Sequence, residues 1–96
     1  MRELARVVIT EFIDERALPA LRARHDVFYD AMLVDDLPSL LKEAASADAI
    51  IVRNRTQVRG ELLAALKQCR VVGRLGVGLD NIDVPACEAR GMTVIP

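Results

Sequence analysis

The chain has 96 residues, of which 52% are hydrophobic and 28% are charged, and its formal net charge is −1. This composition is typical of one folded domain with a modest core, and it excludes an intrinsically disordered chain. The near-neutral charge and the 3% of aromatic residues give no sign of a surface for nucleic acid.

No apolar run approaches the roughly 20 residues that a membrane-spanning helix requires. The first residues, Met1 to Leu4, lack the apolar core of a signal peptide, so we expect a cytoplasmic protein without a membrane partner. Cys69 and Cys87 form no CxxC motif and have no histidine cluster near them. We interpret them as reduced thiols that pack in the core, and we expect no metal site.

The first predicted strand covers residues 5–10, where three β-branched apolar residues in a row indicate burial on both faces, as in a parallel sheet. Asp14 can cap the following helix, which either begins late, near Leu18, or is kinked at Pro19. His25 ends this helix among basic residues, a position that predicts a surface side chain and no catalytic role.

Apolar side chains alternate in the second predicted strand, residues 26–30, which places Val27 and Tyr29 on one face and Phe28 on the other. Acidic residues before a proline mark the start of the second helix. Its apolar stripe is predicted to consist of Leu37, Leu40, Leu41 and Ala44. The remaining predicted elements are a strand at 48–52, a helix at 60–66, a strand from residue 71, a short helix after Asp83 and a strand at 92–95.

Strands and helices therefore alternate along the chain, which predicts an α/β fold with a doubly wound, parallel, five-stranded sheet. The natural arrangement is flavodoxin-like, with the strand order 2-1-3-4-5. Sheets of this kind bind ligands beyond the carboxyl ends of their strands. We expect that edge to hold Glu11, residues 53–56 and residues 74–81.

The stretch from Val71 to Pro96 reads as one βαβ unit with a glycine turn after its first strand. Gly76 and Gly78 allow the backbone to adopt positive φ and to approach a ligand closely. Consecutive N–H groups in such a turn can form a concave anion site. The alternative is a tight turn that binds nothing. Asp83 is the predicted N-cap of the helix that follows.

Three polar residues directly follow the third strand. In an extended segment Arg53 and Arg55 share one side, and Asn54 takes the other. Two guanidinium groups close to a glycine turn with free N–H groups would make an anion pocket. The alternative is a pair of solvated arginines at the end of a strand.

Three stretches of the chain, residues 52–56, 61–63 and 71–83, resemble the D-isomer-specific 2-hydroxyacid dehydrogenases, the family that includes 3-phosphoglycerate dehydrogenase. The resemblance is specific from Ile50 to Pro96 and loose before that. The segments NRTQV and GRLGVGLDNID are most similar to the sulfolactate dehydrogenase branch. The resemblance implies that residues 1–96 are the N-terminal portion of a substrate-binding (catalytic) domain.

The resemblance also implies a substrate site. In the family, the N–H groups of the glycine turn hold the substrate carboxylate, and residues after the third strand contact the rest of the substrate. Many members have serine at the position of Asn54, so the contact to the substrate differs here. The two arginines suggest a 2-hydroxy acid, or the matching 2-oxo acid, with a second anionic group, as in phosphoglycerate or sulfolactate. The expected substrate-binding residues are Arg53, Asn54, Arg55, Gly76, Val77 and Gly78.

Family members bind NAD, or in some cases NADP, in a further domain that contains GxGxxG and the catalytic Arg, Glu and His. No such residues can be matched here, so we expect no catalytic or cofactor-binding residues in this chain and no dehydrogenase activity of the 96 residues alone. The family dimerises mainly through its nucleotide domain, which implies a homodimer for the intact enzyme. A helix from the far C-terminus covers this domain in the family, so an apolar face should be left exposed here.

Other proteins with this fold class fit less well. A phosphorelay receiver needs an aspartate after the third strand, where this chain has Arg53. A flavin-binding flavodoxin needs a hydroxyl-rich loop after the first strand, where Glu11, Asp14 and Glu15 would repel a phosphate. The alternative that stays open is a stand-alone, non-catalytic module that binds a small anion.

Overall fold

The structure, a computed structural model, describes residues 4–96, so the first residues, on which the expectation about a signal peptide partly rests, lie outside it. Two short 3₁₀ helices, η1 (Glu15–Ala17) and η2 (Leu33–Asp35), precede the first two α-helices. The strands and α-helices are β1 (Arg6–Ile9), α1 (Leu18–Arg22), β2 (Asp26–Tyr29), α2 (Leu37–Ala44), β3 (Ala49–Val52), α3 (Gly60–Ala65), β4 (Val71–Arg74), α4 (Val84–Ala89) and β5 (Thr93–Ile95). None of the helices in residues 4–96 has the length and apolar character needed to span a bilayer.

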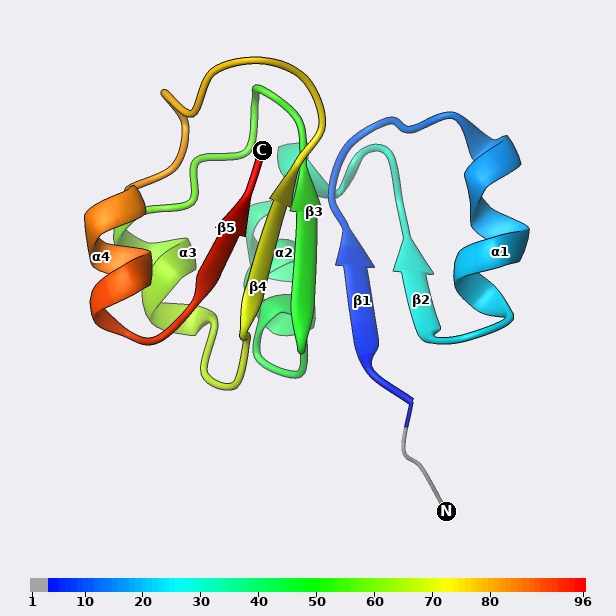
Figure 1. Cartoon of the computed structure of the whole chain (residues 1–96), viewed down its shortest axis with the longest axis horizontal. Helices are drawn as coiled ribbons and strands as arrows, with labels where there is room; N and C mark the ends of the chain where they lie inside the picture. Colours follow the sequence, from blue (N-terminus) through cyan, green and yellow to red (C-terminus); the bar gives the residue numbers. More distant parts are fainter. Residues whose placement is uncertain (1–3) are drawn as a thin grey trace.

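All five strands are parallel, and their order in the sheet is β2-β1-β3-β4-β5. The predicted flavodoxin-like topology is therefore confirmed. The register places Val8 beside Phe28 and Ile50, and Ile50 beside Val72, so these side chains form a row across one face. Because the strands run the same way, their carboxyl ends meet at one edge, the upper edge in Figure 1.

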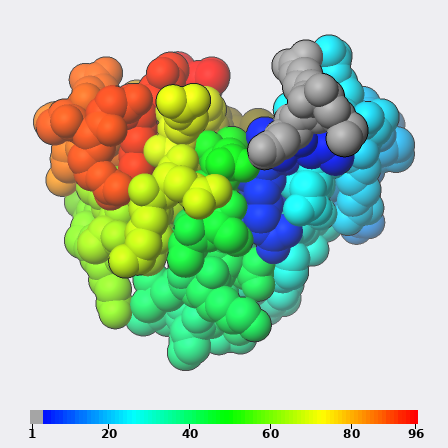
Figure 2. Space-filling model, turned by 90° about the horizontal axis from the view of Figure 1, so that it is seen from below, coloured from blue at the N-terminus to red at the C-terminus, as the bar shows by residue number. Residues whose placement is uncertain are grey.

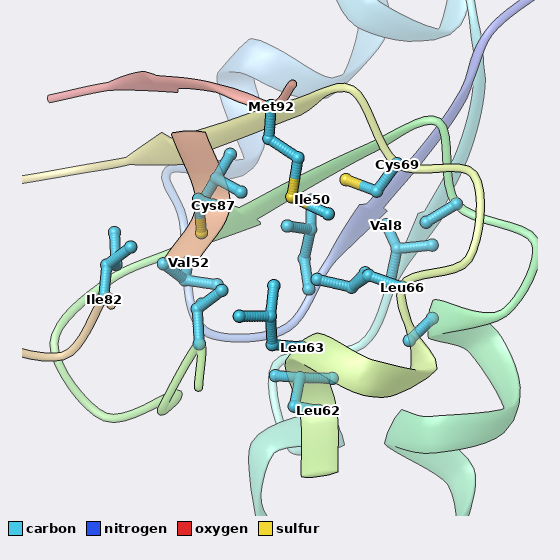
Figure 3. Close-up of a cluster of buried hydrophobic side chains, with 14 of the residues drawn as sticks. Val8, Ile50, Val52, Leu62, Leu63, Leu66, Cys69, Ile82, Cys87 and Met92 are labelled. Carbon is cyan, nitrogen blue, oxygen red and sulfur yellow. The ribbon is translucent and has the colours of Figure 1, made fainter. Parts of the chain in front are cut away.

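The larger core lies between the sheet and the layer that α2, α3 and α4 form on one face (Figure 1). Figure 3 shows side chains of strands, helices and loops that point toward one another there. The members of the larger core include Val8, Ile50, Val52 and Val72 from the strands, Leu40, Leu62, Leu63 and Cys87 from the helices, and Ile82 and Met92 from the connections.

The smaller core lies on the other face, where α1 covers β1 and β2. Val7, Ile9, Ile13 and Leu18 form it, and Val27 and Tyr29 pack against it, whereas Phe28 packs on the larger core. The predicted alternation along the second strand is therefore confirmed.

Beyond α1, the same face is less well covered. Ile51, Gly73 and Ile95 lie side by side in the register of β3, β4 and β5. Ile51 is half-buried and Ile95 is 51% exposed. The expectation of an exposed apolar face agrees with this part of the sheet.

The helix starts follow the polar residues that the sequence supplies. Asp14 accepts a hydrogen bond from the N–H of Arg16 and caps η1, and α1 then begins at Leu18 with Pro19 in its first turn. Of the two predicted alternatives for this helix, the late start is thus correct. Proline is tolerated there because the first N–H groups of a helix have no partner within it.

Asp83 caps α4 as predicted, and Asp36, one of the acids expected before the second helix, caps α2. Asp36 accepts a hydrogen bond from the N–H of Ser39 at the start of α2, and Asp83 accepts one from the N–H of Ala86 at the start of α4. Each satisfies one of the free N–H groups of its helix.

Two expectations about single side chains are wrong. Leu37, placed in the buried stripe of α2, is 48% exposed because it lines an open groove between α2 and α3. Leu40 and Ala44 of the same stripe are buried. His25 is half-buried and not fully exposed, and it lies directly before β2, at the edge where the strands begin. Figure 2 views the molecule from that edge.

Candidate functional site

The carboxyl ends of β1, β3 and β4 are neighbours in the sheet, because these strands are adjacent in its order. The loops that leave them rise above the sheet at the upper edge in Figure 1. They contain Glu11, residues 53–56 and residues 75–81. This is the edge at which parallel sheets of this class bind their ligands.

The glycine turn after β4 is open to solvent. Gly76 has a φ of 121° and Gly78 a φ of 83°, so both adopt the conformations that side chains disfavour. Val77 between them is 91% exposed. Within residues 4–96, the N–H groups of these three residues donate no hydrogen bond. Because they are exposed and unbonded, they can bind an anion.

The Arg74 side chain lies against this turn. A Cβ atom on Gly76 would be 2.6 Å from Nη1 of Arg74, so any larger residue there would displace the end of this flexible side chain. Nε of Arg74 donates to Oδ1 of Asn81 at 3.1 Å, and Nη1 donates to the carbonyl of Leu75 at 3.3 Å. A fixed positive charge therefore lies beside the free N–H groups of the turn.

An open hollow of about 430 Å³ adjoins this arginine. Asn54, Gln57, Arg74, Asp80 and Asn81 line it. Of the residues that the sequence predicted to bind the substrate, Asn54 is the one that lines the hollow. Arg74 and Asn81 were expected at this edge but were not selected as site residues, although each adjoins the glycine motif.

The two predicted arginines make contacts elsewhere. Nη1 of Arg53 donates to the carbonyl of Phe12 at 3.3 Å, and Arg55 forms an ion pair with Asp35 of η2. The ion pair raises the pKa of Arg55 above its ordinary value. In this structure Arg53 and Arg55 therefore face the loops after β1 and β2, and their role in binding a substrate stays a prediction.

Glu11 is a buried carboxylate, 4% exposed, beneath the loop that follows β3. Oε2 accepts hydrogen bonds from the N–H groups of Arg53 at 3.0 Å and Thr56 at 2.7 Å, and Oε1 accepts one from the N–H of Arg55 at 3.1 Å. Burial alone raises the pKa of Glu11, but the hydrogen bonds from Thr56, Arg53 and Arg55 outweigh it, so the pKa lies below its ordinary value. Glu11 is therefore ionised at neutral pH.

Asn81 holds the same loop from the other side. Its side chain is buried, and Nδ2 donates to the carbonyls of Arg53 and Thr56, each at 2.8 Å. Its Oδ1 accepts the bond from Arg74 described above. The loop after β3 is thus connected to the arginine beside the glycine turn through one amide side chain.

No three or more His, Cys, Asp or Glu side chains in residues 4–96 are grouped so that they could hold a metal ion. Both cysteines are buried free thiols, as expected. The histidine of this chain, His25, lies at the opposite edge of the sheet. Exposed N–H groups and the guanidinium of Arg74 gather at the carboxyl edge and suit a small acid, and the carboxylate of Asp80 lines the adjoining hollow.

A parallel, doubly wound sheet with these groups at its carboxyl edge defines an α/β domain with a candidate site for a small anion at that edge. Comparison with known proteins makes the class specific. Residues 7–96 match the family described as D-isomer specific 2-hydroxyacid dehydrogenase, catalytic domain. The chain belongs to this family.

Two curated relatives are similar over most of this chain. An (S)-sulfolactate dehydrogenase of Chromohalobacter salexigens is 53% identical over 90 residues, which are 94% of this chain and 29% of the relative. A D-3-phosphoglycerate dehydrogenase of Archaeoglobus fulgidus is 33% identical over 90 residues, which are 94% of this chain and 17% of the relative. The chain thus spans less than a third of the length of either enzyme.

Solved structures share the fold. The TT0316 protein of Thermus thermophilus superimposes with a TM-score of 0.83 and 29% identity, over 93% of this chain and 29% of that one. A cofactor (NAD+)-bound 3-phosphoglycerate dehydrogenase of Entamoeba histolytica superimposes with a TM-score of 0.72, over 95% of this chain and 32% of that one. The latter is 23% identical, so its likeness concerns the fold alone.

Proposed function

We propose that the chain is the N-terminal portion of the substrate-binding domain of an NAD(P)-dependent dehydrogenase. The enzyme would act on the CH–OH group of a 2-hydroxy acid that has a second anionic group. The observation that supports this most is the exposed glycine turn, whose free N–H groups lie beside the guanidinium of Arg74. The two curated relatives are named for substrates of this kind, one with a sulfonate and one with a phosphate.

The proposed contacts follow from the geometry of the edge. The N–H groups of Val77 and Gly78 would bind the substrate carboxylate, and Arg74 would supply the positive charge next to it. Asn54 lines the adjoining hollow, where its amide can bind the hydroxyl or the second anionic group. Bound in this way, the acid would present its C2 atom to the groups that accept the hydride and the proton.

Arg53 and Arg55 remain candidates for the second anionic group. In this structure Arg55 would first have to leave Asp35, and Arg53 would have to leave the carbonyl of Phe12. An anionic substrate group can replace both partners, because a guanidinium binds sulfonate, phosphate and carboxylate oxygens in the same fork geometry.

The nicotinamide cofactor is proposed to bind outside this chain. A dinucleotide fingerprint has three glycines and opens directly into a helix. Here the glycine turn has no third glycine, and an irregular segment separates it from α4, which begins at Val84. The residues of this chain therefore do not fit a dinucleotide. Within the same proposal, the intact enzyme is a cytoplasmic homodimer.

The alternative is a stand-alone module that binds a small anion without catalysis. The same edge supports it, because the donors there bind an acid whether or not a hydride is transferred. The reading frame after residue 96 distinguishes the two. A GxGxxG motif followed by a histidine supports the dehydrogenase, whereas a stop codon supports the module.

Steady-state kinetics of the full-length protein test the proposal. Lactate, sulfolactate and 3-phosphoglycerate would be compared at saturating NAD and at saturating NADP. We expect kcat/KM for one of the two acids with a second anionic group to exceed that for lactate by at least about tenfold, since a charged hydrogen bond contributes about 1.5–3 kcal/mol. A preference for lactate would contradict a second anionic group.

A further inference from the structure

The loop after β3 is held by both kinds of backbone group. The N–H groups of Arg53, Arg55 and Thr56 donate to the carboxylate of Glu11 at 3.0, 3.1 and 2.7 Å. The carbonyls of Arg53 and Thr56 accept from Asn81. Between these contacts the exposed side chain of Asn54 is placed at the hollow beside Arg74.

The residue before Glu11 makes a further contact with the loop after β3. Glu11 follows Thr10, whose hydroxyl lies 2.7 Å from the hydroxyl of Thr56, with both residues buried. Two kinds of contact therefore join the loops after β1 and β3. One is the hydrogen bond between the hydroxyls of Thr10 and Thr56, and the other is the set of backbone N–H groups that donate to the carboxylate of Glu11. A shift of Glu11 would move the whole segment 53–56, and Asn54 with it.

We propose that Glu11 is a positioning residue for the substrate site: its buried carboxylate holds residues 53–56 in the backbone arrangement that places Asn54 beside Arg74 and the glycine turn. The inference rests on the proposed function, because it assigns the loop a part in binding the acid. Glu11 itself touches no substrate in this account.

The chemistry of three convergent N–H groups explains why a carboxylate is required. An ionised carboxylate only accepts hydrogen bonds, so both oxygens suit donors from the loop. A glutamine of the same shape would turn an NH₂ group toward at least one N–H of the loop and leave that donor unpaired. Aspartate keeps the acceptor chemistry but is one methylene shorter, so it should restore part of the effect.

The experiment compares Glu11→Gln and Glu11→Asp in the full-length protein, with Asp48→Asn as the matched control. Asp48 also accepts a backbone N–H, that of Arg6 at 2.7 Å, and its other oxygen accepts from Gln68. It lies at the start of β3, at the opposite edge of the sheet, away from the proposed site. Loss of the Asp48 carboxylate should lower the stability of the fold without moving the loop after β3.

For Glu11→Gln we expect the KM for the acid to rise about tenfold or more, because a displacement of Asn54 by about 1 Å can weaken substrate binding by that factor. The KM for the nicotinamide cofactor should stay within about twofold of the wild-type value. Glu11→Asp should recover part of the loss. Asp48→Asn should lower the melting temperature and leave both KM values unchanged. If Glu11→Gln lowers the melting temperature as Asp48→Asn does and leaves the KM for the acid unchanged, the role is only structural and the inference is wrong.

Hydrogen exchange measured by mass spectrometry gives a second readout that needs no turnover. In Glu11→Gln, exchange should speed up in residues 53–56 and stay as in the wild type in the core strand β3. Unchanged exchange of the loop would overturn the inference even if the protein is an active dehydrogenase. If the wild type has no activity but the loop responds as stated, the proposed function fails while the positioning of the loop by Glu11 stands.

Discussion

At the scale of single residues, Gly76 has two independent reasons to be glycine. Its φ of 121° disfavours any side chain, and a Cβ atom would meet Nη1 of Arg74 at 2.6 Å. Gly60 offers a matched control, because its φ of 52° is also positive but a Cβ atom there meets nothing within 4 Å. Alanine at Gly60 therefore tests the effect of a positive φ without displacement of the arginine.

We predict that Gly60→Ala lowers the free energy of unfolding by roughly 1–2 kcal/mol, the cost of positive φ for alanine, and leaves the KM for the acid unchanged. Gly76→Ala should cost more, because a φ of 121° lies outside the left-handed region that alanine can adopt, and it should also raise that KM, because Arg74 has to move from the turn. Chemical denaturation and substrate kinetics measure the two quantities. Equal KM values for both variants would show that Arg74 beside the turn has no part in binding.

Glu11 should make stability depend on acid pH. Its pKa is lowered in the folded protein from the ordinary value of 4.5. The resulting stabilisation is fully present above the pKa of the unfolded chain and is lost as the pH falls through the lower pKa of the folded state. The free energy of unfolding of the wild type should therefore fall below about pH 4.5, and that of Glu11→Gln should fall less.

Denaturation curves between neutral and acid pH measure this dependence. Asp14 is the useful comparison, because its pKa is also lowered, by the exposed Arg16. Salt should weaken the contribution of the exposed pair and leave that of Glu11 largely intact. A pH dependence identical in the wild type and in Glu11→Gln would mean that the carboxylate is not preferentially ionised in the folded state.

At the scale of elements, the strands and caps could be predicted because their causes are local. Continuous β-branched runs indicated buried strands, and Asp14, Asp36 and Asp83 lie directly before the helices that they cap. The parallel sheet followed from the alternation of strands and helices, and the strand order was the natural choice for such a sheet, which the family resemblance also implies. Leu37 was misassigned because periodicity alone does not reveal the open groove beside α2.

The site was only partly predictable, since its contacts join distant segments. The sequence selected the carboxyl edge of the sheet and the glycine turn as the candidate site, and their role in binding stays a prediction. It could not show that Arg55 pairs with a carboxylate 20 residues away or that Arg53 binds a carbonyl 41 residues away. Nor did it single out Arg74 and Asn81, whose importance appears only when the turn folds back over the end of β4.

At the scale of the whole molecule, the two thiols report on the integrity of the larger core. Cys69 and Cys87 are buried in it, and burial raises the pKa of both. Only the thiolate reacts with alkylating agents, so labelling should need the core to open. We predict that iodoacetamide labels both thiols slowly in the native protein and fast in denaturant. Fast labelling of either under native conditions would contradict a closed core.

The carboxyl edge of the sheet presents the exposed N–H groups of residues 76–78 and the guanidinium of Arg74. The proposed function depends on the glycine turn at the carboxyl edge, which has to bind the carboxylate of the acid. The effect of a mutation on KM tests this binding site only indirectly, because KM depends both on contacts with the substrate and on changes in the structure of the free protein.

A crystal structure of the full-length protein with a bound 2-hydroxy acid, sulfolactate or 3-phosphoglycerate, tests it most directly. We predict that a carboxylate oxygen lies within hydrogen-bond distance, about 2.7–3.2 Å, of the backbone nitrogens of Val77 and Gly78, with the guanidinium of Arg74 beside it. An acid bound elsewhere, with these two N–H groups still facing solvent, would contradict the account.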